Sequence, residues 1–398
     1  MAGEPDLDGY SAEDAALVRA AEDFVRASGA AAADWDRAGG LPAGVVRQVA
    51  AAGLLAPDLP GAYGGRGIGP GAVGGIAAAL GGVCGSLRGL FTVQGMVAAA
   101  LARWGTRKQR AEWLPSLATG ELLAGFAATE PGAGTALGAV RTRIEPAGAL
   151  DVTVDGHKRW ITFGADADLL LVLGTMGGKP SAVLVETDRP GVTREEVHGQ
   201  LGLRAARIAH VRLDGVRVPR THLVAPAGLG LSHVVGTALD HGRFTVAWGC
   251  VGMAEACVED AAAHAANRRQ GEQLLGEQQL VRSLLATSAV AATGARELAR
   301  SAARARARGW GHGVPETLVA KYAAASAAAS ASRDAVQMLG SAGIEPDSRA
   351  GRHFRDAKVM EIIEGAQQVL ELHIAERLLR RFATVPGAAA VRTAERPS

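Results

Sequence analysis

Two segments combine glycines and hydroxyl side chains in a pattern suited to holding a bound group. One reads F-A-A-T-E-P-G-A-G-T over 126–135, and the other reads K-R-W-I-T-F-G-A-D-A-D over 158–168. The first predicts a loop whose backbone N–H groups can turn toward an anion such as phosphate. It contains three turn-forming residues and two hydroxyl donors: Pro131, Gly132, Gly134, Thr129 and Thr135. The alternative is a glycine turn that joins a helix to the first strand.

The elements that position these segments follow from a change in composition along the chain. Alanine falls from 14 residues in 1–50 to 3 in 151–200 and rises to 15 in 301–350. The ends therefore predict helices, and the centre predicts short strands. We predict an N-terminal helical domain over 1–125, a middle β domain over 126–230, a C-terminal helical bundle over 231–384 and a disordered tail over 385–398.

Local signals place several of these elements. Ser11 with Asp14 three residues later predicts a capped first helix, and a second helix is expected after Pro42. The glycines of 61–75 predict a loop. Strands are expected at 150–154, 169–174, 182–186 and 210–213, with turns at D-G 155–156, G-G-K-P 177–180 and D-G 214–215. Four bundle helices are expected at 232–267, 275–309, 315–340 and 356–382.

Charge and cysteine content exclude several classes of protein. The 398 residues contain 42 basic and 40 acidic side chains, so there is no basic excess for nucleic acid. Three cysteines are too few for a disulfide framework or a four-ligand zinc site, and a reducing cytoplasm fits best. The acidic N-terminus and the lack of a long apolar run support neither secretion nor a membrane span.

The two segments together resemble the acyl-CoA dehydrogenase family, whose middle-domain signature is similar to T-E-P-G-A-G-S followed by W-I-T. Further pieces follow in the family's order and spacing over nearly the whole chain. They are L-G-L-R at 201–204, D-G-V-R-V-P at 214–219, G-R at 242–243, C-V-G-M-A at 250–254, Q-M-L-G-S-A-G at 337–343 and R-D-A-K at 355–358. Each piece is a weak signal alone, but the ordered set is highly specific.

The resemblance implies a mainly α-helical fold with a middle antiparallel β-barrel-like domain and a C-terminal four-helix bundle. It also implies FAD-dependent dehydrogenation of an acyl thioester, in which a base removes the α-proton and flavin N5 accepts the β-hydride. Electrons would pass to an electron-transfer flavoprotein or to oxygen.

For the cofactor, the resemblance implies that Thr129 bonds the pyrimidine side of the flavin and Thr135 meets the pyrophosphate. Trp160 would cover one flavin face, and the hydroxyl of Thr162 would reach N5, which favours the electron-rich reduced ring. The full implied set is Phe126, Thr129, Gly134, Thr135, Trp160, Thr162, Arg268, Gln279, Gln337, Gly340 and Gln368. A core aromatic is the alternative interpretation of Trp160.

The segment K-V-M-E-I-I-E-G-A-Q-Q at 358–368 resembles the family's Y-E-G-T step, which implies that Glu364 is the catalytic base. Burial beside Ile363 would raise the carboxyl pKa toward the working pH. Gly365 would let the thioester approach the backbone, and the N–H of the base residue would polarise its carbonyl. Glu361, one turn earlier, is the competing glutamate, and we expect it to be solvated or salt-bridged.

Other matched residues imply an oligomer. Arg268 and Gln279 resemble residues that reach the FAD of a neighbouring subunit, and Gln337 with Gly340 resembles the loop that meets its adenosine half. A homodimer or homotetramer is therefore expected. A surface ion pair is the alternative for each arginine, and for Arg243, expected near the substrate, the two interpretations stay equal.

The chain departs from the family pattern at five positions, and each change removes a contact or adds charge near the expected cofactor. We therefore expect FAD to be held loosely. The five residues are Ala136, Gly271, Glu272, Ser341 and Ala366.

The stretch C-G-S-L-R-G-L-F-T-V-Q-G-M-V at 84–97 is most similar to a branch found in natural-product gene sets. That branch acts on acyl groups held on carrier proteins, so the thioester could be carried by coenzyme A or by a carrier protein. Two alternatives stay open: a flavin monooxygenase or oxidase of the same fold, and an FAD-free binding protein.

Overall fold

The computed structural model describes residues 10–380, 382 and 383, and the tail predicted over 385–398 lies outside them. Six helices form the N-terminal part: α1 (Ala12–Ser28), α2 (Ala32–Ala38), α3 (Ala43–Ala51), α4 (Pro70–Val83), α5 (Gly85–Trp104) and α6 (Arg107–Thr119). The predicted cap of α1 is confirmed, because Ser11 accepts from the Asp14 N–H and the Asp14 side chain accepts from the Ser11 N–H. The helix expected after Pro42 is α3.

The loop predicted over 61–75 is wrong in its second half, where α4 begins at Pro70. The glycines of this helix allow close packing on α7 (Gly236–Asn267). A Cβ atom at Gly74 would lie 2.4 Å from the Trp248 ring, and one at Gly81 would lie 2.4 Å from the Gly249 carbonyl oxygen. The cost of glycine in a helix is thus offset by a helix contact that larger residues would block.

The middle part is one sheet of eight strands: β1 (Ala124–Ala127), β2 (Arg143–Ala147), β3 (Asp151–Ile161), β4 (Leu169–Met176), β5 (Lys179–Glu186), β6 (Val192–Glu196), β7 (Ala209–Pro219) and β8 (Leu223–Val224). Their order is β6-β7-β3-β2-β4-β5-β8, with β1 beside β4. The sheet is mixed, because β1 and β2 pair with β4 in parallel. The predicted antiparallel barrel is therefore corrected to a mixed sheet, and no pairing among the described residues closes it.

Two predicted turns lie inside long strands instead. The D-G pairs at 155–156 and 214–215 face each other across the β3–β7 ladder, where the register shifts between Val154 and Gly156. The Gly215 N–H donates to the Asp155 carboxylate at 2.8 Å. The residues that favour a hairpin turn here form an irregularity within a strand pair. The turn predicted at 177–180 does join β4 to β5.

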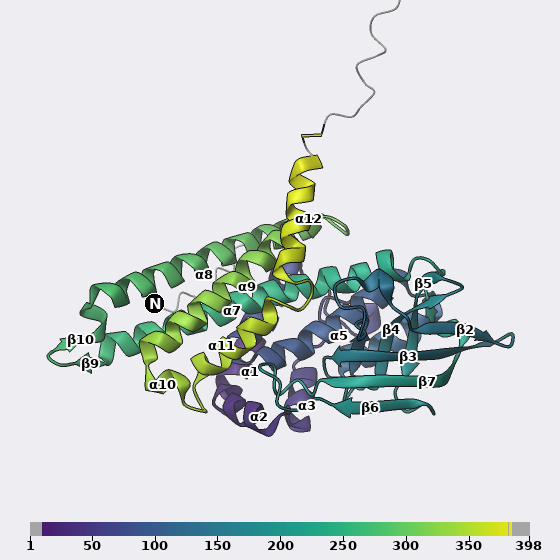
Figure 1. The fold of residues 1–398 in the computed structure, drawn as a ribbon, viewed down its shortest axis with the longest axis horizontal. Coiled ribbons are helices and arrows are strands. Elements are labelled where there is room, and N and C mark those ends of the chain that lie inside the picture. Colours follow the sequence, from purple (N-terminus) through teal and green to yellow (C-terminus); the bar gives the residue numbers. More distant parts are fainter. Residues whose placement is uncertain (1–9, 381, 384–398) are drawn as a thin grey trace, which may run out of the picture.

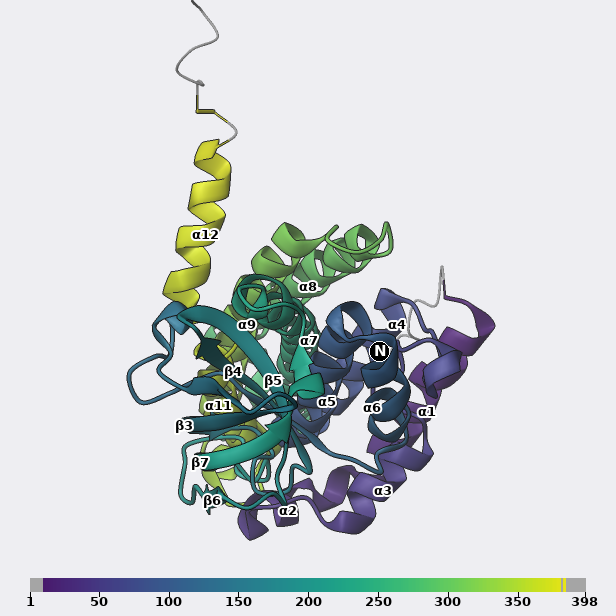
Figure 2. The same cartoon turned by 90° about the vertical axis from the view of Figure 1, so that its right-hand side faces the viewer.

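The C-terminal part begins with a π-helical turn, Gly230–Val235, that leads into α7. It continues with β9 (Arg269–Gln270), β10 (Gln273–Leu274), α8 (Gln279–Arg306), α9 (Val314–Leu339), α10 (Ser341–Ile344), α11 (Arg349–Met360) and α12 (Gln367–Arg380). The single fourth helix predicted over 356–382 is wrong: a turn at 361–366 separates α11 from α12. Helix α12 projects away from the body of the protein (Figures 1 and 2).

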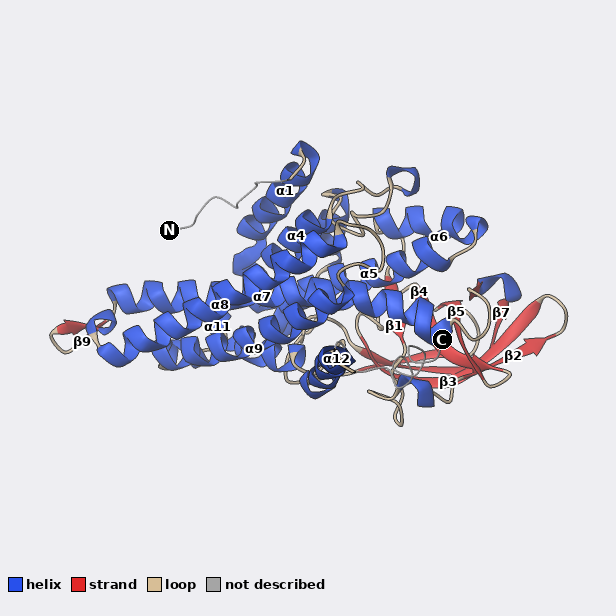
Figure 3. Cartoon of the chain, turned by 90° about the horizontal axis from the view of Figure 1, so that it is seen from above, coloured by secondary structure: helices blue, strands red, loops and turns tan. Residues whose placement is uncertain are grey.

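Helix α5 lies between the bundle and the sheet, and this arrangement places the site (Figure 3). Buried residues of α5, α7 and α9 share one core, which includes Leu90, Trp248 and Ala324. A second core joins α5 and α6 to the sheet, for example through Leu101 and Leu171. Among the described residues, no helix is both long and apolar enough to cross a membrane.

Candidate functional site

The turn between α11 and α12 holds Glu364 in a backbone conformation that L-residues rarely adopt. Its φ is +55°, and that of Gly365 is +103°. The adjacent surface of α7 makes room for the carboxylate, because a Cβ atom at Gly242 would lie 3.0 Å from Glu364 Oε2. A left-handed non-glycine residue persists only where its surroundings fix it.

Two cations fix this turn through its backbone carbonyl groups. Arg243 Nε donates to the Glu364 carbonyl oxygen at 2.8 Å, and Lys321 Nζ donates to the Gly365 carbonyl oxygen at 2.8 Å. Lys321 is fully buried on α9. We call these two residues the carbonyl clamp. Arg243 thus contacts the turn of Glu364, and among the described residues it forms no surface ion pair.

Among the described residues, one oxygen of the carboxylate is left without a hydrogen-bond partner. Glu364 Oε2 is buried and unbonded. Burial raises the pKa of Glu364 above its ordinary value, and Arg243, Lys321 and Arg88 oppose that rise. Burial also lowers the pKa of Lys321 to about 8. A buried carboxyl that is free to accept a proton is suited to act as a base.

Glu361 has a different environment. Lys358 Nζ donates to its carboxylate at 2.9 Å, so the expected salt bridge is confirmed. The two glutamates of this segment are therefore distinct in chemistry, and only Glu364 has a buried, unpartnered oxygen among the described carboxylates of the turn.

The loop after β1 is anchored by a buried ion pair. Lys158 Nζ lies 2.7 Å from Glu130 Oε1, and it also donates to the carbonyl oxygens of Ala128 and Leu173. Glu130 accepts further bonds from Thr142 and from the Arg141 N–H. Burial raises the pKa of Glu130, but these bonds outweigh burial and hold it below its ordinary value, while burial lowers the pKa of Lys158 to about 8.

The ion pair anchors the root of the loop after β1, and the tip of this loop faces outward. Gly134 and Thr135 are exposed, and a Cβ atom at Gly134 would meet nothing within 4 Å. None of the described hydrogen bonds uses the backbone N–H of either residue. Phe126 and Thr129 are half-buried at the root of the loop. The exposed N–H and hydroxyl groups suit the phosphate oxygens of a nucleotide.

Trp160 lies at an irregularity of β3 with φ of +60° and is 53% exposed. The core-aromatic interpretation of this residue is therefore wrong. The backbone N–H of Trp160 donates to His210 Nδ1 at 3.2 Å. Thr162, two residues later, turns toward α5, where its methyl group would lie 3.6 Å from a Cβ atom at Gly89. An exposed indole held in a strained conformation fits a residue that covers a bound ring.

Five predicted cofactor residues lie elsewhere in the protomer. Arg268 and Gln279 flank the β9–β10 hairpin, at the end of the bundle opposite to the sheet (Figure 1). Gln337 and Gly340 end α9, and Gln368 begins α12. All five are exposed. The structure does not bring Arg268 or Gln279 to the loop of Thr129 within one chain.

The altered hairpin loop has its own geometry. Gly271 and Glu272 form the two-residue turn between β9 and β10, and Gly271 has φ of +62°. A phenylalanine at this position would be strained. The backbone of this hairpin therefore favours glycine at position 271.

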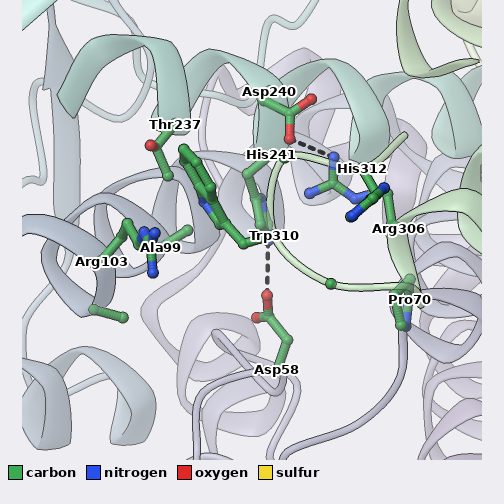
Figure 4. Close-up of a pocket in the computed structure, with 13 residues that line it drawn as sticks. Asp58, Pro70, Ala99, Arg103, Thr237, Asp240, His241, Arg306, Trp310 and His312 are labelled. Carbon is green, nitrogen blue, oxygen red and sulfur yellow. Dashed lines mark hydrogen bonds and ion pairs between the residues drawn. The ribbon is translucent and has the colours of Figure 1, made fainter. Parts of the chain in front are cut away.

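A cavity of about 350 Å³ lies between α5, α7 and the loop before α9 (Figure 4). His241 Nε2 lies 3.2 Å from Asp58 Oδ2 at its wall, and Arg306 pairs with Asp240. His241 and Asp240 directly precede Gly242 in the chain, but no residue of the turn at 361–366 lines this cavity.

Sequence reasoning missed three residues that organise the site: Glu130, Lys158 and Lys321. Glu130 and Lys158 lie inside the quoted motifs, and their opposite charges could have suggested that they form an ion pair. Lys321 had no signal, because its partner is 44 residues away along the chain.

Comparisons with known proteins agree with this architecture. Family models match 11–121 as the acyl-CoA dehydrogenase N-terminal domain, 125–216 as the middle domain and 229–379 as the C-terminal domain. The human mitochondrial short-chain specific acyl-CoA dehydrogenase is 30% identical over 357 residues, which cover 88% of this chain and 86% of that protein.

Two solved structures are also similar. FkbI, described as acting in biosynthesis of the methoxymalonyl extender unit of the polyketide immunosuppressant Fk520, has a TM-score of 0.85 and 38% identity, covering 90% of this chain and 99% of its own. A glutaryl-CoA dehydrogenase from Mycobacterium smegmatis in complex with FADH2 has a TM-score of 0.88 and 27% identity, covering 94% and 96%.

Proposed function

The chain belongs to the acyl-CoA dehydrogenase family, and on that premise we propose that it dehydrogenates an acyl thioester with Glu364 as the base. This family is one of FAD-dependent oxidoreductases, and FAD is its cofactor. The observation that supports the assignment most is the buried, unpartnered carboxylate oxygen of Glu364 in a left-handed turn.

Glu364 removes the α-proton of the thioester. Its raised pKa favours proton acceptance, and the carbonyl clamp of Arg243 and Lys321 holds the turn in place. None of the described hydrogen bonds uses the Glu364 N–H. This N–H polarises the thioester carbonyl and lowers the barrier to enolate formation, as an oxyanion hole does.

The residues around the loop fit FAD. Phe126, Thr129, Trp160 and Thr162 would hold the ring, and the exposed loop at Gly134 and Thr135 would hold the pyrophosphate. When bound, FAD supplies the acceptor for the β-hydride. The final electron acceptor would be an electron-transfer flavoprotein or oxygen.

The thioester handle is coenzyme A or a carrier protein, since both end in a phosphopantetheine arm. The resemblance of the stretch at 84–97 favours the carrier protein, and the similarity to FkbI, described as acting in biosynthesis of a polyketide extender unit, supports a role in secondary metabolism. Because Cys84, Cys250 and Cys257 are buried free thiols, we place the enzyme in the cytoplasm.

The active enzyme is a homodimer or homotetramer. Arg268 and Gln279 lie at the end of the bundle opposite to the sheet, so they reach a flavin only in a neighbouring subunit (Figure 1). Helix α12 also exposes apolar side chains that a second copy would cover: Leu372, Leu378 and Leu379.

The visible spectrum of the purified protein and its anaerobic titration with acyl thioesters test this function. We expect a flavin spectrum that thioester bleaches without oxygen. A protein without flavin would support the binding-protein alternative, and a flavin that reacts only in the presence of oxygen would support the monooxygenase alternative.

A further inference from the structure

The exposed indole of Trp160 projects from a β-bulge. The β3–β7 register shifts over 158–161, so that two residues of β3, Arg159 and Trp160, lie opposite one residue of β7, His210. A bulge of this kind leaves backbone groups outside the strand ladder and re-aims the side chain beside it. The N–H groups of the bulge therefore need partners other than the carbonyl groups of the opposite strand.

Two specific partners accept these N–H groups. The Arg159 N–H donates to the Thr129 carbonyl oxygen at 2.9 Å, which ties the bulge to the loop after β1. The Trp160 N–H donates to His210 Nδ1, and the rings of these two residues meet edge to face with their centroids 5.4 Å apart. His210 thus contacts both the backbone and the ring of Trp160, whose left-handed φ requires such support.

The bond to His210 requires one protonation state of its imidazole. Nδ1 accepts the Trp160 N–H through its lone pair, so the proton of the neutral ring lies on Nε2. A protonated imidazole carries hydrogen on both nitrogens and accepts no hydrogen bond. Neutral His210 is therefore compatible with this conformation of Trp160, and the imidazolium is not.

Charged and titratable groups surround His210 on three strands. On β3 they are Arg159 and His157, whose ring centroid lies 6.4 Å from that of His210. On β6 Glu195 pairs directly with His210, and on β7 itself Arg212 lies two residues further on. Burial, Arg159 and His157 lower the pKa of His210 below its ordinary value, and Glu195 opposes them. The imidazole is therefore neutral at pH 7 and becomes protonated only in more acidic solution.

We propose that His210 is a positioning residue that holds Trp160 in its left-handed conformation for contact with the flavin ring, and that it does so only while its imidazole is neutral. Protonation of His210 breaks the bond to the Trp160 N–H and releases the indole, so FAD binds less tightly in acid. This assignment rests on the proposed FAD site, because the contact between Trp160 and the flavin comes from it. The conformation of Trp160 can also be followed without flavin, so a failure of one claim is distinguishable from a failure of the other.

Full-length, flavin-free protein labelled with 5-fluorotryptophan tests the conformation directly. The sequence has six tryptophans, and the fluorine signal that is missing in Trp160→Phe belongs to Trp160. We expect this signal to move between about pH 8 and about pH 5 in the parent protein, with a midpoint below 6.5. His210→Asn keeps an acceptor oxygen close to the position of Nδ1 and does not titrate, so its signal should stay at the neutral position.

FAD affinity, measured by quenching of flavin fluorescence, then links this conformation to the cofactor. His210→Leu has no acceptor and should raise the Kd for FAD by about 3- to 10-fold at neutral pH, whereas His210→Asn should match the parent. In acid the Kd should rise by a similar factor in the parent but not in His210→Asn. His157→Asn is the matched control, because its imidazole contacts His210 and not the Trp160 N–H, and it should keep the parent's affinity and transition.

Three results would overturn the assignment. The Trp160 signal of the parent could be independent of pH, or His210→Asn could keep the parent's acid transition. The signal could also move while the Kd for FAD stays equal in the parent, His210→Leu and His210→Asn, which would mean that only the charge of the imidazole is sensed. If the parent binds no FAD, the proposed cofactor site fails, and the fluorine signal still decides whether His210 fixes Trp160. The parent and His210→Asn decide the question if His210→Leu does not fold.

Discussion

Replacing Lys321 with methionine removes a buried positive charge next to the proposed base while keeping much of the side-chain volume. Lys321 donates to the Gly365 carbonyl oxygen, and its other charged neighbours include Glu364, Arg243 and Glu361. The substitution therefore tests whether the carbonyl clamp sets the proton affinity of Glu364.

The magnitude follows from charge and burial. At roughly 8 Å and an effective dielectric constant of about 20, a positive charge stabilises a carboxylate by ~2 kcal/mol. Since about 1.4 kcal/mol corresponds to one pH unit, losing Lys321 should move the acid limb of the kcat/KM profile upward by about 1.5 pH units. The sign is upward because the ionised Glu364 loses a stabilising cation and binds its proton more tightly.

Stability should respond differently. The pKa of Lys321 falls from 10.5 to about 8 in the folded protein. Between these values the unfolded chain binds more protons, so parent stability should increase as pH rises through that window, and Lys321→Met should lack this increase. Near neutral pH, removal of the buried charge and loss of its hydrogen bond oppose each other, so the free energy of unfolding should change by only about 1–2 kcal/mol.

The assay is kcat/KM as a function of pH, read from flavin reduction, together with chemical unfolding at several pH values. Lys358→Met is the control, because Lys358 pairs with Glu361 and should leave the acid limb in place. An acid limb at the same pH in Lys321→Met and the parent would refute the argument, even if the variant were slower.

Three further perturbations have defined outcomes. Glu130→Gln leaves the buried Lys158 without an anion, so thermal unfolding should shift by an amount equivalent to roughly 3–5 kcal/mol, and flavin should be lost on dialysis; an unchanged melting midpoint would contradict the anchoring role. Gly242→Ala places a methyl group against the base carboxylate and should lower kcat by at least about 10-fold, whereas Gly294→Ala, which meets nothing within 4 Å, should keep full activity. Arg268→Ala should weaken flavin retention in the assembled oligomer, and a parent protein of about 41 kDa in solution that retains full flavin would exclude the cross-subunit contact.

Local signals in the sequence predicted local structure well. The cap at Ser11 and Asp14 and the turn at 177–180 depend on neighbouring residues, and both are present. Glycine was less informative, because a glycine that forms a turn and a glycine that allows close packing inside a strand or helix look alike in sequence. The D-G pair at 155–156 lies within a strand, and Gly74 lies in a helix that packs closely on Trp248.

In the site, too, local sequence signals were informative, but features that depend on distant contacts could not be predicted. The motifs pointed to Glu364 and Trp160 as candidate site residues, but they did not predict the positive φ that both residues have. That conformation depends on contacts with distant elements, such as the bond from Arg243 to the Glu364 carbonyl oxygen. The buried contact of Thr92 with Thr245 likewise depends on how α5 faces α7, which residue spacing within one helix does not determine.

The most direct test of the central claim compares Glu364→Gln with Glu361→Gln in anaerobic single-turnover flavin reduction by an acyl thioester. Glutamine keeps the shape of glutamate and removes its basicity, so FAD should stay bound in both variants. We expect Glu364→Gln to reduce the rate by roughly 10²–10⁴-fold and Glu361→Gln to stay close to the parent. A slow Glu361→Gln beside a fully active Glu364→Gln would move the base by one turn, and full activity in both would contradict base-assisted dehydrogenation.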